Sequence, residues 1–395
     1  MENFEYRIPT RILFGKGTEE QAGKLIREYG FRKVLLHYGG GSVVRSGLLD
    51  RVRESLRAEG IEFAELGGVQ ANPVLGMVRR GIQMCLEEKA ELILAVGGGS
   101  VIDSAKAIGD GAGNPDTDVW KYFLKEAVPQ KAVPVAVILT LAASGSEMSD
   151  SAVITNEENG LKRGFGSPFH RPLFALCNPE LTFSVSRFQT GCGTVDIMMH
   201  TLERYFGWTK DSSVTDRLAE GLLQAVIEAG RKADQDPEDY EARAALMWAG
   251  SLSHNGLTGL GRAYMMQVHQ LEHELSGMYP RIAHGAGLSA LFCSWARFVC
   301  PAAPERFAQY GQRVWDVEMN TENPMETALA GIQATEEYFR SLNMPISLEE
   351  LEVEPERFEE MAEKCTNFGA RTLPGIRELG KEEMLEIYRM AYPRR

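Results

Sequence analysis

Short hydrophobic runs alternate with longer stretches of helical periodicity through the first half of the chain. The runs predict strands, and the stretches between them predict helices. We expect strands at residues 11–15, 33–38, 61–66, 92–96 and 134–140, and helices near 18–29, 46–59, 74–88 and 101–108. Strands that alternate with helices of this length are typical of a parallel sheet with helices on both faces. The sequence therefore predicts an α/β, Rossmann-like domain.

Two short motifs predict how particular elements begin and turn. Thr18, followed three residues later by Gln21, has the form of a capping box that opens the first helix. Asn159-Gly160 favours a type I′ turn, so we expect a β-hairpin between SAVIT and the segment that begins at Lys162. The residues from Ser149 to Asn159 also fit an edge hairpin with its polar groups in solvent.

The strand pattern stops after the segment NPELT, residues 178–182. From about Phe188 onward the apolar positions have helical spacing, and acidic connectors such as 234–240 separate the stretches. A length of 395 residues also suits two domains better than one core. We expect a dinucleotide-binding α/β domain at residues 1–185 and an all-helical metal- and substrate-binding domain at residues 186–395.

Charge and composition argue against several classes of function. The net charge of −13 comes with no basic stripe, so we expect neither nucleic acid nor an anionic membrane as a partner. No run approaches the length of a membrane span, and MENFEYRIPT lacks the apolar core of a signal peptide. The six cysteines are scattered without a C-x-x-C pair, which favours a reducing, cytoplasmic setting.

Two glycine runs, 39–41 and 97–99, follow predicted strands directly and precede helices. Backbone N–H groups at such a turn attract anions, and glycine lets a pyrophosphate approach closely. Neither run is G-x-G-x-x-G, and no acidic residue follows the first run where a ribose would need one. A single run fits a plain tight turn equally well. Two runs at neighbouring strand ends favour a dinucleotide cleft.

A candidate metal site lies in two apolar stretches of the second half. Asp196 and His200 are four residues apart, so both project from one helix face, and His269 and His273 repeat this spacing before His284. One carboxylate with two or three imidazoles can bind a divalent first-row metal and leave a position for substrate. Either pair alone is more often a hydrogen-bonded core pair. Together they favour a metal, because each buried polar group needs a partner.

These motifs, in this order and spacing, resemble the iron-containing alcohol dehydrogenase family, and within it the NADP-dependent butanol dehydrogenase-like branch. The resemblance covers nearly the whole chain. Its segments are NFEYRIPTRILFGKG, ANPVLGMVRRG, LAVGGGSVIDSAKAI, LTLAASGSEMS, NPELT, VDIMMHTLERY, NGLTGLGR, HQLEHELSGMY and IAHGAGLS. It implies reversible hydride transfer between a primary alcohol or aldehyde and NADP(H), by a homodimer or larger homo-oligomer.

The resemblance also implies roles for individual residues. Asp196, His200, His269 and His284 look like the metal ligands, with Fe(II) as the usual ion and Zn(II) as a common substitute. His273 looks like the imidazole that relays a proton beside the nicotinamide. The implied cofactor contacts are Gly39, Gly40, Ser42, Asn72, Gly98, Gly99, Ser100, Asp103, Thr140, Ser144, Ser149, Lys162 and Leu181.

The preference for NADP(H) is implied by the turn after the second strand. Members of the family that prefer NAD carry an aspartate there, whereas this chain has Gly39 and Gly40, with Ser42 and Arg45 nearby. An uncharged turn beside a cation leaves room for a 2′-phosphate.

Two other functions stay open. A lyase or synthase on the same scaffold, similar to dehydroquinate synthase, would need several Lys and Arg around a phosphorylated substrate, but the ligand segments here are apolar. A nucleotide-binding regulatory protein with a structural metal is the second alternative. Turnover of NADPH with a panel of alcohols and aldehydes separates these functions from a dehydrogenase.

Overall fold

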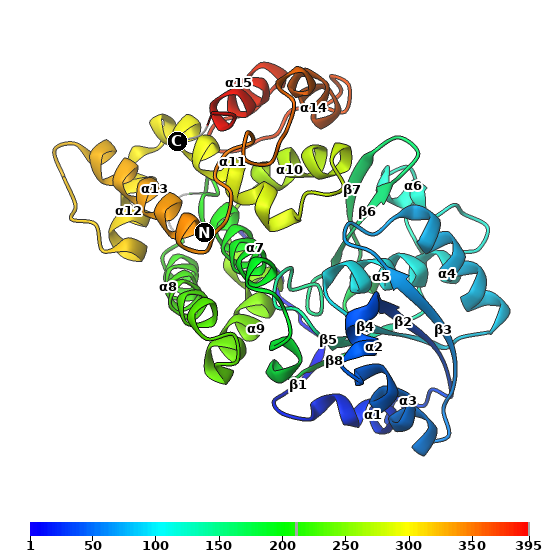
Figure 1. Cartoon of the computed structure of the whole chain (residues 1–395). Coiled ribbons are helices and arrows are strands. Elements are labelled where there is room, and N and C mark those ends of the chain that lie inside the picture. The colour runs from blue at the N-terminus through cyan, green and yellow to red at the C-terminus, as the bar shows by residue number, and fades with distance from the viewer. Residues whose placement is uncertain (210–211, 394–395) are drawn as a thin grey trace. The chain divides into compact units, whose positions relative to one another are not determined.

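The computed structural model of the protein describes residues 1–209 and 212–393, and the chain divides into two compact units. One unit comprises Arg7–Ser184, and the other comprises Val185–Arg395 together with Met1–Tyr6 (Figure 1). The first residues group with the second unit through contacts such as the backbone hydrogen bond from Glu2 N to Gly261 O, at 2.9 Å.

The unit Arg7–Ser184 is built on a parallel sheet. Within this fully described segment the sheet has six strands in the order β1-β8-β5-β4-β2-β3. The strands are β1 Arg11–Phe14, β2 Lys33–Gly39, β3 Glu62–Val69, β4 Leu92–Gly97, β5 Val135–Leu139 and β8 Phe174–Cys177. The helices are α1 Ala22–Glu28, α2 Gly41–Arg45, α3 Leu48–Ala58, α4 Leu75–Glu87, α5 Gly99–Gly113 and α6 Trp120–Phe123. The α/β architecture predicted from the sequence is confirmed.

Helices cover both faces of this sheet. Alternate residues of β2 and β4, such as Val34, Leu36 and Leu94, share one core cluster with Ile26 of α1 and Val52 of α3. Helices α4 and α5 lie on the opposite face (Figure 1). Every residue of β4 is buried, which is why this strand reads as an unbroken apolar run.

The hairpin predicted around Asn159-Gly160 is present, but its turn is not type I′. Strands β6 Ser151–Asn156 and β7 Leu161–Gly166 pair antiparallel, and the loop between them has four residues. A type I′ turn requires positive φ at both central residues, and here only Gly160 of the pair has it, at 65°. The Asn159 side chain instead accepts a hydrogen bond from Leu161 N at 3.1 Å, which stabilises the longer loop.

A further expectation about the first unit is wrong. The first helix has no capping box: Gly17 is the N-cap, a 3-10 turn covers Thr18–Gln21, and α1 begins only at Ala22. Glu19 in this turn points inward and accepts a hydrogen bond from Asn178 Nδ2, so a tertiary contact decides the local geometry. Strand β8 lies before residues 178–182, after which the strand pattern was expected to stop, but it was not among the expected strands. It has only four residues and is fixed by pairing with β1 and β5.

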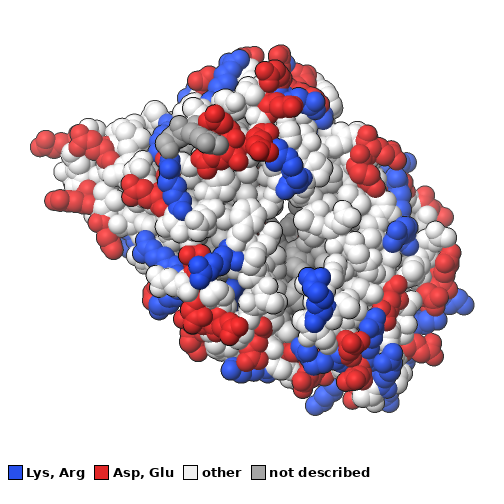
Figure 2. All heavy atoms as spheres, in the orientation of Figure 1, with Lys and Arg blue, Asp and Glu red and all other residues white. Residues whose placement is uncertain are grey.

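The second unit is helical. Its helices in the described residues are α7 Arg187–Tyr205, α8 Ser213–Gln235, α9 Tyr240–His254, α10 Gln267–Met278, α11 His284–Val299, α12 Pro304–Trp315, α13 Pro324–Ser341, α14 Phe358–Cys365 and α15 Lys381–Ala391. Helix α7 is buried from Thr190 to Tyr205 and packs against α8, α9 and α11. No helix among the described residues has the length and hydropathy to cross a membrane. On the face shown in Figure 2, basic and acidic side chains are interspersed.

Candidate metal centre and cofactor-binding loops

The four predicted metal ligands lie together in the helical unit. Asp196 and His200 project from α7, His269 projects from α10, and His284 begins α11. Three imidazole nitrogens surround Asp196 Oδ1: His200 Nδ1 at 3.6 Å, His269 Nε2 at 3.5 Å and His284 Nε2 at 3.7 Å. Tetrahedral coordination with metal–ligand bonds of about 2.1 Å places neighbouring ligand atoms about 3.4 Å apart. The separations are close to this value.

The chemistry of the cluster also fits a metal. Asp196 Oδ1, His200 Nδ1 and His269 Nε2 are buried and form no hydrogen bond with any described residue. Buried polar atoms without partners are rare, and three that converge on one point require a common ligand. Burial, followed by the neighbouring His254 and His269, lowers the pKa of His200 well below its ordinary value. The imidazole is therefore neutral, which is the form that binds a metal.

Two buried glutamates, which the sequence analysis did not single out, hold two of these imidazoles. Glu203 on α7 accepts a hydrogen bond from His269 Nδ1, and Glu272 on α10 accepts one from His284 Nδ1. Each glutamate stands three residues after a candidate ligand, inside an otherwise apolar helix. A search for acidic residues one turn beyond His200 and His269 would have found both.

Helix α11 reaches the cluster because Gly285 lies against the backbone of α7. A Cβ atom at Gly285 would lie 2.1 Å from the carbonyl oxygen of Cys192, which is far below an ordinary contact. The glycine is thus required for close helix packing and not for an unusual φ angle. The approach brings His284, the preceding residue, to Asp196.

His273 lies beside the cluster, but its ring nitrogens are not among those that surround Asp196 Oδ1. The side chain is buried, and the ring centroid is 6.5 Å from that of His269 and 5.8 Å from that of His284. Among the described residues, Glu272, His273 and His284 form a second group with ligand atoms within 4.8 Å of one another. Glu272 accepts a hydrogen bond from His284 Nδ1, and Nε2 of the same ring faces Asp196. Because His284 belongs to both groups, the second group extends the first cluster. His254 of α9 also adjoins the cluster, with a ring centroid 3.9 Å from that of His200.

The predicted cofactor residues lie in the other unit, along one edge of the sheet. Gly39 ends β2 and Gly40 follows it, Gly98 to Ser100 follow β4, Thr140 follows β5, and Leu181 lies in the short turn after β8. These strands are neighbours, and the strand order reverses between β2 and β4. In parallel sheets this edge, at such a reversal, is where dinucleotides bind.

Side-chain contacts hold the predicted cofactor loops together. A Cβ atom at Gly99 would lie 2.3 Å from Ser144 Oγ, so glycine lets the turn after β4 pack against the loop after β5. Asp103 accepts hydrogen bonds from Ser146 Oγ at 2.6 Å and from Val153 N at 2.9 Å, which ties α5 to the same loop and to the hairpin.

Lys106 ties α5 to the same loop through a single buried cation. Its Nζ donates to the backbone oxygens of Ser146, Ser149 and Ser151 at 2.7–3.1 Å and also lies near the hydroxyls of Ser146 and Ser149. Burial lowers the pKa of Lys106 to about 8. In the hairpin, Lys162 Nζ donates to Asn72 Oδ1 at 3.0 Å, so these two predicted contacts meet.

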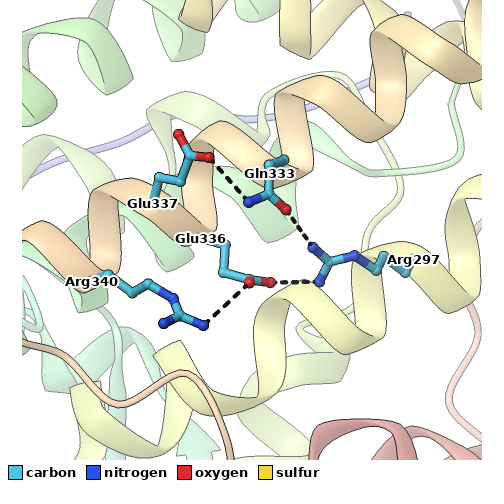
Figure 3. A pocket seen from close by; sticks show the side chains of 5 residues that line it. All are labelled: Arg297, Gln333, Glu336, Glu337 and Arg340. Atoms are coloured by element: carbon cyan, nitrogen blue, oxygen red, sulfur yellow. Dashed lines mark hydrogen bonds and ion pairs between the residues drawn. The ribbon is translucent and has the colours of Figure 1, made fainter. Parts of the chain in front are cut away.

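A surface hollow of about 550 Å³ between α11 and α13 does not have the features of a catalytic site (Figure 3). Its side chains pair with one another: Arg297 Nη1 contacts Glu336 Oε2 at 2.7 Å, and Gln333 Nε2 donates to Glu337 Oε1 at 3.1 Å. Arg297 is thirteen residues beyond His284 on α11, which corresponds to about 20 Å along the helix. We assign this hollow a structural ion-pair network.

Comparison with known proteins places the chain in one family. Residues 9–179 match the family model described as iron-containing alcohol dehydrogenase, and residues 190–392 match the C-terminal model of the Fe-containing alcohol dehydrogenase family. The chain is 41% identical over 393 residues to NADH-dependent butanol dehydrogenase A of Clostridium acetobutylicum, covering 99% of this chain and 100% of the relative. It is 34% identical to the NADPH-dependent aldehyde reductase YqhD of Escherichia coli, covering 99% and 100%.

A solved structure agrees with this placement. The crystal structure of NADH-dependent butanol dehydrogenase A from Thermotoga maritima superposes with a TM-score of 0.95 at 35% identity, and the match covers 100% of this chain and 99% of that one. Both halves of the sequence and the complete fold thus point to the same relatives. The chain belongs to the iron-containing alcohol dehydrogenase family.

Proposed function

We propose that the protein is a metal-dependent, NADP(H)-linked alcohol dehydrogenase or aldehyde reductase that acts on primary alcohols and the corresponding aldehydes. The observation that carries this proposal is the convergence of three imidazole nitrogens on Asp196 Oδ1, with buried atoms that lack hydrogen bonds. Asp196, His200, His269 and His284 would hold the ion, and Fe(II) or Zn(II) suits this nitrogen and oxygen donor set.

The chemistry follows from these side chains. A divalent ion held by these ligands would supply Lewis acidity toward the substrate oxygen, and a bound nicotinamide would supply or accept the hydride. The chain's own residues supply placement and proton transfer. We assign His273 the role of passing the alcohol proton to water, because it adjoins the ligands and imidazole titrates in a suitable range. The four ligands already provide a complete protein set, so His273 is not needed as a fifth.

The turn after β2 supports NADP(H) as the cofactor. Gly39, Gly40 and Ser42 carry no negative charge, and the Arg45 guanidinium folds back so closely that a Cβ at Gly41 would lie 2.3 Å from its Nη1. A cation without a competing carboxylate favours a 2′-phosphate. Relatives are named for either cofactor: the enzyme of Clostridium acetobutylicum is NADH-dependent and YqhD is NADPH-dependent. Both cofactors must therefore be compared directly.

The test is an assay of the purified protein with NADPH and NADH against a panel of aldehydes, and with the oxidised cofactors against the matching alcohols. We expect turnover that a chelator removes and that Fe(II) or Zn(II) restores, with a higher kcat/KM for NADPH. Equal or better efficiency with NADH would reject the cofactor assignment alone. Absence of turnover with every pair, in protein that binds the metal, would favour the synthase or regulatory alternatives.

The setting of the enzyme is part of the same proposal. The six cysteines lie among the described residues, form no disulfide and are buried, which suits a reducing cytoplasm. The interspersed charges on the visible surface offer no basic stripe for nucleic acid (Figure 2). We propose a homodimer or larger homo-oligomer, and sedimentation measures this directly.

A further inference from the structure

We infer that Glu203 is a positioning residue of the metal centre, which selects the metal-binding tautomer of His269 and fixes the start of α10 against α7. This inference rests on the metal centre of the proposed function. Glu203 was not among the residues that the sequence or the family resemblance indicated, and its hydrogen bonds go to Val268 and His269.

The geometry gives Glu203 two simultaneous tasks. Glu203 is 2% exposed, and its Oε1 accepts a hydrogen bond from Val268 N at 2.5 Å. Its Oε2 accepts from His269 N at 3.2 Å and from His269 Nδ1. The first N–H groups of any helix lack partners within the helix, and a carboxylate at that end is favoured by the helix dipole. Glu203 therefore acts as the N-terminal cap of α10, and a residue of α7 supplies the cap.

The contact with the ring decides which nitrogen of His269 carries the proton. An ionised carboxylate can only accept hydrogen bonds, so Nδ1 must be the protonated nitrogen. In the neutral ring, which is the form that binds a metal, the lone pair then lies on Nε2, which faces Asp196 Oδ1 at 3.5 Å. Carboxylates that hold ligating histidines in this way orient the ring and strengthen the ligand. A single buried side chain thus couples the docking of two helices to the ligand state of one imidazole.

Glu203→Gln separates this role from simple packing. The amide has one acceptor oxygen and one NH2 group where the carboxylate had two acceptor oxygens, but the site presents three N–H donors. If the NH2 group faces the ring, His269 must accept at Nδ1 and carry its proton on Nε2, the atom that should bind the metal. If the NH2 group faces Val268 N, two N–H donors face each other, and α10 loses the hydrogen bond that caps its first turn. Either outcome weakens the metal centre.

The experiment uses the full-length protein and two readouts. Zn(II) affinity is measured by competition with a chelator of known strength. ¹⁵N NMR of histidine-labelled, metal-free protein reports the tautomer of His269 well above pH 9, where the ring is neutral. Burial lowers the pKa of this imidazole, but the Glu203 and Asp196 carboxylates raise it overall to about 9, and only a neutral ring has a tautomer. We expect the parent to show the Nδ1–H form, and Glu203→Gln to show a 10- to 100-fold loss of Zn(II) affinity with a shift toward the Nε2–H form. Glu336→Gln is the matched control. It removes another buried carboxylate of the same unit, one paired with Arg297, and should change neither readout.

Each outcome decides a separate point. Affinity within twofold of the parent and an unchanged tautomer in folded Glu203→Gln would overturn the inference. Should that variant fail to fold, the parent still decides, because an Nε2–H form of His269 in the parent excludes the proposed role. A parent that binds no Zn(II) or Fe(II) would refute the proposed function, while the tautomer measurement would continue to test Glu203.

Discussion

Gly285→Ala should loosen the metal centre by adding one methyl group outside it. The added Cβ would lie 2.1 Å from the carbonyl oxygen of Cys192 and 2.6 Å from its carbonyl carbon and Cα, all of them backbone atoms that cannot rotate away. Ordinary contact begins near 3.4 Å, so α11 must move from α7 by more than about 1 Å. Overpacking of this kind costs about 1–3 kcal/mol.

The same displacement acts on the ligands. His284 precedes Gly285, and its Nε2 is 3.7 Å from Asp196 Oδ1, so a shift of α11 widens this pair beyond the span of one ion. Substituting a residue that only supports a metal ligand typically lowers the metal affinity about 10- to 100-fold. Displacing a ligand itself should therefore weaken Zn(II) binding by at least about tenfold. The assay combines chelator competition with urea denaturation of the full chain.

Gly221→Ala provides the matched control. Gly221 lies on the exposed side of α8 in the same unit, and nothing lies within 4 Å of an added Cβ. Alanine there should stabilise the protein by about 0.5–1 kcal/mol, because glycine is the poorer helix former. Both substitutions replace glycine by alanine within a helix, but they should change the free energy of unfolding in opposite directions. If Gly285→Ala gains stability as Gly221→Ala does and keeps the parent's metal affinity, the packing argument is refuted.

Three further outcomes are expected. His273→Ala should retain the metal and lose most of its activity; metal loss would make His273 a ligand, and full activity would make it a packing residue. Burial lowers the pKa of His37 from 6.5 to about 4. The neutral imidazole therefore stabilises the fold fully above pH 6.5, and about 3 kcal/mol of the free energy of unfolding is lost as the pH falls toward 4. His37→Asn should flatten this part of the curve of stability against pH. Lys106→Met removes the donor to the buried backbone oxygens of Ser146, Ser149 and Ser151. The substitution should therefore raise the KM for the cofactor and destabilise the protein by about 3–5 kcal/mol. An unchanged KM would mean that Lys106 does not hold the cofactor loop.

Much of the architecture could be predicted because the spacing of hydrophobic residues along the chain determines the helices and strands. Each of the five expected strands and the helices between them is present, and the apolar run at residues 92–96 correctly indicated a strand, every residue of which is buried. The spacing of Asp196 and His200 likewise predicted two side chains on one helix face. The predicted cofactor residues stay predictions, although the structure places most of them after neighbouring strands.

Elements that depend on partners were missed or misjudged. Strand β8 is too short to be recognised from its own four residues and exists because β1 and β5 pair with it. The capping box at Thr18 gave way to a 3-10 turn in which Glu19 contacts Asn178, a residue 159 positions away. The four-residue hairpin loop likewise replaced the tighter turn that Asn159-Gly160 favours by itself.

By itself the sequence determined which residues could form a metal centre, because one aspartate and several histidines in apolar helices need partners wherever they are buried. Only the tertiary structure decided that α7, α10 and α11 meet, and which atoms face one another. Glu203 and His269 are 66 residues apart, and Gly285 allows the approach only because the backbone of Cys192 lies against it. Periodicity describes the surroundings of a residue along its own helix. Close packing and the satisfaction of buried donors are properties of several helices together, so they appear only when the chain is folded.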